Sequence, residues 1–560
     1  MCASLWLASL SNWPLWQAFA ALPESSSLRG RLFLLGFGLI IAAVTTAMLS
    51  LLAWRWTIKP VVVLFLLAAA FGAHFMGAYG VVIDPTMMVN VIRTDVHEVS
   101  DLLSLQLLFN VLLLSVPPLL LLWRVPLAGK PFLAQSMRNA LVLGAALVLA
   151  GILIMLSFAH LSSAMRNHKE LRYMINPLNS FYALGRVAFD SAAIRGGPPA
   201  EIGKDVRLLP RPADAKPPLV MLVLGETARS DHFSLNGYSR TTNPETSQLD
   251  VISFREVMSC GTNTEASLPC MLSHFGRDGF VGRAQEYENL LDLLQRAGMA
   301  VLWLENQSGC KGLCERVPHA FASAAPVGTT HAAGLCNNDV CLDEALFTGL
   351  DERLAAMPEA QRKLGVVLVM HQMGSHGPAY SKRSPEQRKP FMPECTSKAL
   401  QECSQQQLVN VYDNSIAYTD HVLAQGIDWL SRQQASFSPS MLYMSDHGES
   451  LGENNLYLHG LPYAIAPREQ KHVPMILWLT AKTAAAMTLD DACLRKRKDE
   501  AFSHDNLFHS VMGLAGLTST EYRADLDVFH SCRAAPDAND VKSGGGIPAV
   551  SHRSESGSGG

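Results

Sequence analysis

The sequence has little charge and no long run of basic residues. Only 17% of its 560 residues are charged, 49% are hydrophobic, and the formal net charge is −4. Without a basic stretch to neutralise phosphates, a nucleic-acid partner is excluded. The mean hydropathy of +0.14 also excludes an ordinary soluble enzyme and a mainly disordered chain. We therefore expect more than one domain, one of them in a lipid bilayer.

Cysteine is missing from almost half of the chain. After Cys2 the next cysteine is Cys260, so ten of the 11 cysteines follow position 259. An even number of cysteines confined to one half of a protein is typical of disulfides formed in an oxidising compartment.

Charged side chains are nearly absent from several stretches of about 20 residues, the length needed to cross a bilayer. The first stretch has neither the basic start nor the cleavage site of a secretory signal. It is either a span or an interfacial or misassigned start. The five predicted spans cover residues 1–23, 32–54, 61–83, 102–123 and 139–159.

Basic residues decide the orientation of these spans. The positive-inside rule places the loops richest in Lys and Arg, and with them the N-terminus, in the cytoplasm. Five spans then leave everything after residue 160 outside, in agreement with the cysteines. The loops after the second and fourth spans hold Arg55, Lys59, Arg124, Lys130 and Arg138, whereas those after the first and third hold Arg29, Arg31 and Arg93.

The loop between the third and fourth spans has polar residues at helical spacing. Asn90, Thr94 and Glu98 would share one face of a single helix at i, i+4 and i+8. Such a stripe at the membrane surface could hold a lipid headgroup, or it could be the solvated face of a simple connector.

The second half has the pattern of an α/β domain. Residues 161–216 gain charge and end in a Pro- and Gly-rich stretch typical of a linker. Short apolar runs, beginning with PLVMLVLG, then alternate with segments of helical spacing. We predict a membrane domain over 1–160, a catalytic domain over 217–533 with a largely parallel central sheet, and a disordered tail over 534–560.

Chemically useful side chains follow the predicted strands, where an open α/β sheet builds its site. Each alone is better explained as a structural residue. Together they supply the oxygen and nitrogen ligands that suit zinc. These side chains are Glu226, His376, Asp446, His447 and His459.

The segment SCGTNTEASLPCML offers three hydroxyls as nucleophiles, Thr262, Thr264 and Ser267. A metal ion could activate one of them, and a helix N-terminus could hold a phosphoryl group. The alternative is an ordinary helix-capping cluster.

Six motifs in order, VLGETAR, SCGTNTEASLPCM, NQSGCKG, GSHGPAY, SDHGESLGE and YLHGLPYAIAP, resemble those of the phosphoethanolamine transferases of the alkaline phosphatase superfamily. The loop YGVVIDPTMMVNVIRTD is also similar to that family's. The resemblance implies a multi-pass protein of the bacterial inner membrane with an alkaline-phosphatase-like, sulfatase-like domain in the periplasm, and we expect it to be a monomer.

Carried over to this sequence, the resemblance implies a zinc site and a covalent mechanism. Thr264 would take phosphoethanolamine from phosphatidylethanolamine, release diacylglycerol, and pass the group to lipid A or inner-core lipopolysaccharide, conferring polymyxin resistance. A periplasmic glucan is a further possible acceptor. The implied zinc ligands are Glu226, Asp446, His447 and Thr264, and the residues implied to bind the phosphoryl group, or a second zinc, are Lys311, His376 and His459.

Glu265, next to the implied nucleophile, departs from the family, where small or uncharged residues are common. It could weaken binding of an anionic acceptor or contact the ethanolamine ammonium. Other functions remain open at this point. They are a phosphoglycerol transferase or sulfatase-like phosphodiesterase of the same superfamily, and a non-catalytic membrane scaffold that binds lipid.

Ten cysteines allow on the order of nine hundred complete pairings, so their sequence positions alone cannot choose one. Short loops close most easily, and the resemblance supports the first and fourth of the pairs below. The alternative, a structural zinc site, would need paired CxxC spacings that this region lacks. We predict the pairs Cys260–Cys270, Cys310–Cys314, Cys336–Cys341, Cys395–Cys403 and Cys493–Cys532.

Overall fold

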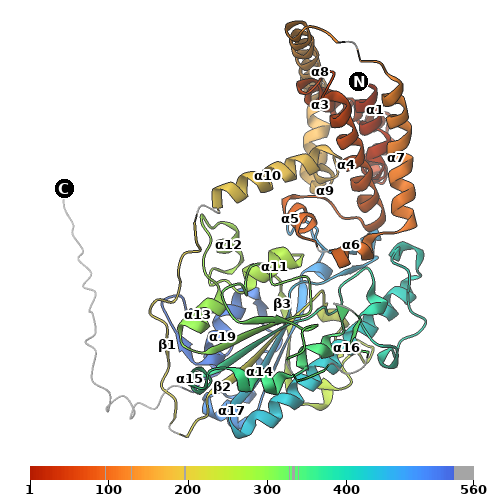
Figure 1. Ribbon diagram of the computed structural model, residues 1–560. Coiled ribbons are helices and arrows are strands. Elements are labelled where there is room, and N and C mark those ends of the chain that lie inside the picture. The colour runs from red at the N-terminus through yellow and green to blue at the C-terminus, as the bar shows by residue number, and fades with distance from the viewer. Residues whose placement is uncertain are drawn as a thin grey trace, which may run out of the picture.

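The computed structural model has an elongated helical part joined to a larger α/β part (Figure 1). The predicted disordered tail lies outside the described residues, apart from Ala534. The structure describes residues 1–94, 96–127, 129–194, 197–212, 214–326, 328–330, 334–337 and 340–534.

Four helices in the described part of the chain are long and apolar enough to cross a membrane. Their sequences carry almost no charge, and many of their large apolar side chains face outward, as lipid-facing side chains do. They are α3 (Leu28–Leu51), α4 (Ile58–Tyr79), α7 (Leu105–Arg124) and residues Phe132–Phe158 of α8 (Phe132–Asn167).

The structure does not confirm the predicted fifth span over residues 1–23, because these residues do not form one long helix. This segment forms two short helices, α1 (Cys2–Ala8) and α2 (Trp13–Ala20), separated by a 3-10 turn. The Asn12 side chain donates to the carbonyl of Leu7 at 2.7 Å, which a continuous helix would use for its own ladder. At about 1.5 Å per residue, neither helix approaches the thickness of the hydrocarbon.

Two short helices connect α4 to α7 on the side of the α/β part, α5 (Pro85–Arg93) and α6 (Val96–Leu102). The Asp84 side chain caps α5 by accepting from the amide of Met87 at 2.8 Å. The helix ends at Arg93, because Thr94 is extended, with φ −61° and ψ 130°. The predicted single helical stripe is therefore interrupted at Thr94.

After α8 the chain forms α9 (Lys169–Tyr173) and α10 (Leu178–Ile194) and then reaches the α/β part. There β1 (Arg207–Leu208) pairs with β14 (Leu517–Thr518), so the connecting segment is hydrogen-bonded to the last strand of the α/β part.

An eight-stranded sheet is the core of the α/β part. Its central strands are buried on both faces, which explains their continuous apolar sequences. In spatial order the strands are β13 (Ala501–Ser503), β3 (Val251–Met258), β12 (His472–Leu479), β9 (Ser438–Ser445), β2 (Pro218–Gly225), β8 (Val366–His371), β4 (Ala300–Glu305) and β5 (His319–Phe321).

The sheet is mixed, so the prediction of a largely parallel sheet is wrong. Strand β12 runs antiparallel to both of its neighbours, β3 and β9. A parallel return needs a crossover, usually a helix. Between β9 and β12 the chain forms only turns, 3-10 segments and the hairpin of β10 (Ser450–Leu451) and β11 (Tyr457–Leu458), so it re-enters the sheet in the opposite direction.

Helices cover both faces of the sheet (Figure 1). Alternate residues of β2 face opposite sides: Val220 and Leu222 pack into one apolar cluster, and Leu219 and Met221 into the other. The first face carries α11 (Thr264–Met271), α13 (Leu290–Arg296) and α19 (Leu507–Ala515), and the second carries α14 (Leu350–Ala356) and α16 (Gln405–Arg432). The remaining elements are α12 (Gly276–Val281), α15 (Glu359–Leu364), α17 (Ala481–Ala486), α18 (Asp491–Lys496), β6 (Cys336–Asn337) and β7 (Val340–Cys341).

All five predicted disulfides are present, and they lie in the α/β part. Four of them close loops with sequence separations of 10, 4, 5 and 8 residues, and the fifth has a separation of 39. Cys2 is the free cysteine.

Candidate active site

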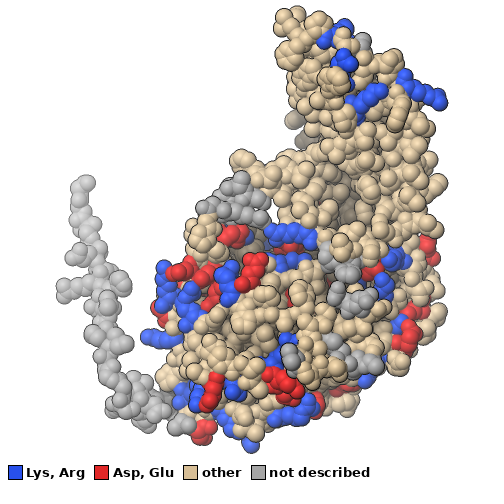
Figure 2. Space-filling model, viewed as in Figure 1, with Lys and Arg blue, Asp and Glu red and all other residues tan. Residues whose placement is uncertain are grey.

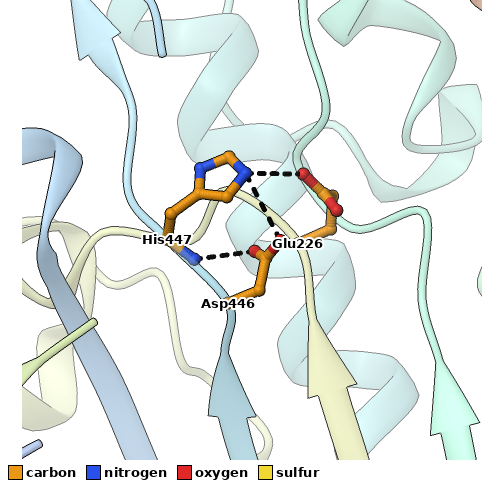
Figure 3. Close-up of side chains that lie close together, drawn as sticks. All are labelled: Glu226, Asp446 and His447. Carbon is orange, nitrogen blue, oxygen red and sulfur yellow. Dashed lines mark hydrogen bonds and ion pairs between the residues drawn. The ribbon is translucent and has the colours of Figure 1, made fainter. Parts of the chain in front are cut away.

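Two neighbouring parallel strands bring the predicted metal ligands together. Gly225 at the end of β2 lies opposite Ser445 at the end of β9, and the next residues are Glu226 and Asp446. Gly225 has to be glycine, because a Cβ atom there would lie 2.5 Å from the Tyr443 hydroxyl. The two carboxylates consequently leave the same edge of the sheet side by side (Figure 3).

Glu226, Asp446 and His447 form a compact cluster that the structure buries completely. The Nε2 atom of His447 lies 3.3 Å from Glu226 Oε1 and 3.3 Å from Asp446 Oδ2. Among the described residues neither of these carboxylate oxygens has a hydrogen-bond partner. Buried oxygens normally have partners, so these two are suited to a bound cation.

The charges of the cluster also favour a cation. Burial raises the pKa of Asp446 to about 7, and the nearby negative charge of Glu226 adds to this increase. Burial alone would lower the pKa of His447, but Asp446 and Glu226 raise it to about 10. Two adjacent buried carboxylates therefore require a positive charge, which a divalent metal supplies when it replaces the imidazole proton. The residues present fit a metal site.

Thr264 is the hydroxyl that faces this cluster. It is the first residue of α11, whose N-terminus is capped by Asn263 through the amide of Ala266 at 2.9 Å. Its Oγ1 donates to Glu226 Oε2 at 3.0 Å and lies 3.5 Å from His447 Nε2.

The other two candidate nucleophiles have local roles. Thr262 donates to the carbonyl of Leu461 at 2.6 Å, and Ser267 accepts from the amide of Gly261 at 3.0 Å. The structure therefore places Thr264, rather than Thr262 or Ser267, against the cluster of candidate metal ligands.

Sequence reasoning missed Gln307. Its side-chain amide donates to Glu226 Oε2 at 2.8 Å, so it orients the carboxylate that also contacts Thr264. Gln307 follows β4 within the motif NQSGCKG, and its position after a buried strand was a usable signal.

The predicted phosphoryl-binding histidines adjoin the cluster. The His459 ring lies 4.3 Å from that of His447 and 5.5 Å from that of His376, measured between centroids. His459 Nδ1 also contacts Glu449 at 3.1 Å. Burial lowers the pKa of His459 well below its usual value, and the neighbouring imidazoles add to this effect.

Lys311 lies farther out than the histidines. Its ammonium donates to Ser308 at 2.8 Å, and it lines a cavity of about 590 Å³ together with Thr86, Arg93 and Glu265. The cavity lies between α5 and α11.

The predicted headgroup residues are on the membrane side of this site. Thr94 donates to the carbonyl of Asn90 at 2.7 Å, so its hydroxyl closes the end of α5. Glu98 is in α6, but its side chain lies outside the described residues.

The site combines carboxylates at strand ends, a buried histidine and a hydroxyl at the start of a helix. Together with the mixed sheet, these features define a sulfatase-like metal-binding domain, which is joined to a membrane domain. Residues 218–517 match the Sulfatase family model, and residues 41–192 match the model described as Phosphoethanolamine transferase EptA/EptB.

Similarity to known proteins extends over nearly the whole chain. Phosphoethanolamine transferase EptA of Escherichia coli K12 is 38% identical over 524 residues, covering 92% of this chain and 93% of the relative. Phosphatidylethanolamine transferase Mcr-1 of Escherichia coli is 37% identical, with coverages of 87% and 90%. The solved structure of the integral membrane lipooligosaccharide phosphoethanolamine transferase A of Neisseria meningitidis matches with a TM-score of 0.87 and 31% identity, covering 95% and 98%. The chain therefore belongs to the phosphoethanolamine transferase family and is an enzyme of that class.

Proposed function

We propose that this enzyme transfers phosphoethanolamine from phosphatidylethanolamine to lipid A through a covalent intermediate on Thr264, with zinc as its metal. The observation that carries the proposal is the contact of the Thr264 hydroxyl with Glu226, in the cluster where two buried carboxylate oxygens and His447 converge. Four oxygen and nitrogen ligands, with Thr264 as the fourth, suit tetrahedral zinc.

Two displacements complete the reaction. In the first, Thr264 Oγ1 forms a bond to phosphorus, the bond from phosphorus to the diacylglycerol oxygen breaks, and the threonine proton ends on diacylglycerol. In the second, an acceptor phosphate oxygen forms a bond to the same phosphorus, the bond from phosphorus to Thr264 Oγ1 breaks, and Oγ1 regains a proton from the acceptor phosphate. Bound zinc would lower the pKa of the Thr264 hydroxyl and offset negative charge at the phosphoryl group.

Lys311, His376 and His459 are proposed to hold the phosphoryl oxygens. His459 and His376 adjoin the metal cluster, whereas Lys311 faces the cavity from which a lipid would arrive. A second zinc at the histidines is the alternative. Asn90, Thr94 and Glu98 are proposed to contact the donor headgroup, because α5 and α6 lie between the membrane helices and the site.

We propose a location in the bacterial inner membrane with the catalytic part in the periplasm. Lys and Arg gather at the end of the membrane helices that is farthest from the catalytic part (Figure 2), which the positive-inside rule assigns to the cytoplasm. The five disulfides fit the oxidising periplasm.

Lipid A is the proposed acceptor because the Neisseria meningitidis relative is named a lipooligosaccharide transferase. Capping its phosphates would remove negative charge and weaken cationic peptides such as polymyxin.

The test is to trap the intermediate. The full chain is incubated with vesicles that contain phosphatidylethanolamine but no acceptor, and its peptides are mapped by mass spectrometry. We expect phosphoethanolamine on Thr264, complete loss of transfer in Thr264→Ala, and substantial activity in Thr262→Ala as the matched control. An adduct on Thr262 or Ser267 would overturn the assignment, and so would full activity after removal of zinc by a chelator.

A further inference from the structure

An ion pair joins the membrane part to the residue that follows the nucleophile. Arg93 of α5 binds the carboxylate of Glu265 in α11. The Glu265 side chain is only 8% exposed and that of Arg93 is 39% exposed, so the pair lies at the edge of the buried contact. In Figure 1, α5 lies beside α11 at the junction of the two parts.

Each residue occupies the helix end that favours its charge. Arg93 is in the last turn of α5, and Glu265 is in the first turn of α11. These preferences explain why each charge is tolerated in its own helix. They do not explain why two helices from different parts of the protein meet at these residues.

The position of Glu265 creates an electrostatic problem for catalysis. It is adjacent in sequence to Thr264, and it lines the same cavity as Lys311. A phosphodiester that reaches Thr264 is an anion, so an uncompensated carboxylate there would repel it. Because Glu265 is largely shielded from solvent, salt would screen this repulsion only weakly.

We propose that Arg93 is a counter-ion that offsets the charge of Glu265 and so makes this carboxylate compatible with an anionic lipid phosphate. Arg93 acts through Glu265 and is thus a positioning residue for the donor. This inference rests on the proposed function, in which the donor phosphate binds next to Thr264.

A second contact between the two parts provides a comparison. Asp101 of α6 binds Lys382 at 2.6 Å, Lys398 at 3.3 Å and Arg383 at 3.6 Å. Loss of Lys382 leaves Asp101 with two other cations, whereas loss of Arg93 removes an ion-pair partner of Glu265. Lys382→Gln is therefore a matched control that also removes a cation from the contact between the two parts.

The experiment is a double-mutant cycle in the full chain. Arg93→Gln, Glu265→Gln and the double variant are assayed for diacylglycerol release from phosphatidylethanolamine vesicles, with kcat and KM determined separately. We expect Arg93→Gln to raise KM about tenfold with little change in kcat, which corresponds to about 1.4 kcal/mol. Glu265→Gln and the double variant should both stay within about threefold of the unchanged enzyme, because both remove the negative charge at position 265.

Conservative rescue and a structural readout complete the test. Arg93→Lys should retain a KM within about threefold, since it keeps the positive charge, and so should Lys382→Gln. Hydrogen exchange should become faster in α5 of Arg93→Gln, independently of turnover.

Several results would overturn the inference. One is a double variant as impaired as Arg93→Gln, which would show that repulsion by Glu265 plays no part. Others are an unchanged KM and unchanged α5 exchange in Arg93→Gln, or loss of kcat in Glu265→Gln. Failure of the unchanged enzyme to release diacylglycerol would count against the proposed function, while α5 exchange would still report on the ion pair.

Discussion

The membrane part and the catalytic part expose opposite kinds of side chain. In the catalytic part, apolar strands such as β2 are inside, and the surface carries many charges of both signs (Figure 2). In the membrane part, large apolar side chains are on the outside: Leu105 is 86% exposed and Trp123 is 85% exposed. Its interior contains apolar clusters and also hydrogen-bonded amides, notably those of Asn12 and Asn176.

The difference follows from the solvent that each part meets. In lipid, the burial of leucine gives no hydrophobic stabilisation, so the membrane helices associate through packing and interior hydrogen bonds. In water, the burial of apolar side chains stabilises the fold. In the catalytic part this stabilisation offsets the free-energy cost of a buried cluster of charges.

The largest expected effect on activity comes from substituting the candidate metal ligands. Glu226→Gln or Asp446→Asn should lower the transfer rate by about a thousandfold or more and lower bound zinc, because each removes a charged ligand. Glu256→Gln is the matched control, since that carboxylate is 47% exposed and pairs with Arg468. Activity assays and metal analysis of the purified full chain provide the measurement. Zinc content unchanged in both cluster variants would contradict the assignment.

Disulfide removal should destabilise the catalytic part according to the size of the loop. Replacing Cys493 and Cys532, which are 39 residues apart, should cost about 4 kcal/mol of unfolding free energy in the loop-entropy account. Replacing Cys310 and Cys314, only 4 residues apart, should cost about 2 kcal/mol. Denaturant unfolding of the two double-serine variants measures the difference. Equal losses would show that local packing, not loop closure, sets the cost.

His504 should make the catalytic part less stable in acid. Its Nδ1 accepts from the amide of Cys260 at 3.0 Å, which requires a neutral ring, and its Nε2 contacts the carbonyl of Ser445 at 2.9 Å. Burial lowers its pKa from 6.5 to about 4, so between these values the unfolded chain binds more protons.

The contribution of His504 is complete above pH 6.5 and is lost as the pH falls toward 4, by about 3 kcal/mol in total. His504→Gln should flatten the pH dependence of thermal unfolding over this interval. If the variant and the unchanged chain lose stability in parallel, the destabilisation comes from other groups.

The smallest expected effect is in the membrane part. Asn12→Ala removes a side chain that donates to Leu7 and accepts from the amide of Asn176 at 2.8 Å. Interior hydrogen bonds in membrane proteins contribute about 1 kcal/mol. Unfolding in mixed micelles should detect this loss, with half-buried Ser136→Ala, which removes a hydrogen bond within one helix, as the control. A loss as large as that of the long disulfide would contradict the comparison.

The sequence was informative where a strand ends in a chemical group. Glu226, Asp446 and His447 could be nominated because parallel strands bring their carboxyl ends to one edge. Four disulfides could be predicted because their cysteines are closely spaced, and the fifth because Cys493 and Cys532 were the two that remained. Roles beyond proximity, including those of Lys311 and His376, stay predictions.

Other features depended on contacts that local patterns do not encode. The antiparallel direction of β12 follows from the lack of a helix between β9 and β12. The sequence contained this signal, but the continuous apolar run of β12 favoured a parallel strand. The break at Asn12 depends on a partner more than 160 residues away in the chain. The pairing of Glu265 with Arg93 likewise needs the fold, because 172 residues separate them.

The order of the disulfides has a consequence for how the protein is made. From Cys260 onward the ten cysteines are bonded in five consecutive pairs, and no bridge encloses or crosses another. During export the chain emerges residue by residue, so an oxidase that joins each newly emerged thiol to the one before it would produce the native set. Correct maturation would then not require a disulfide isomerase, and secretion itself would supply the pairing information.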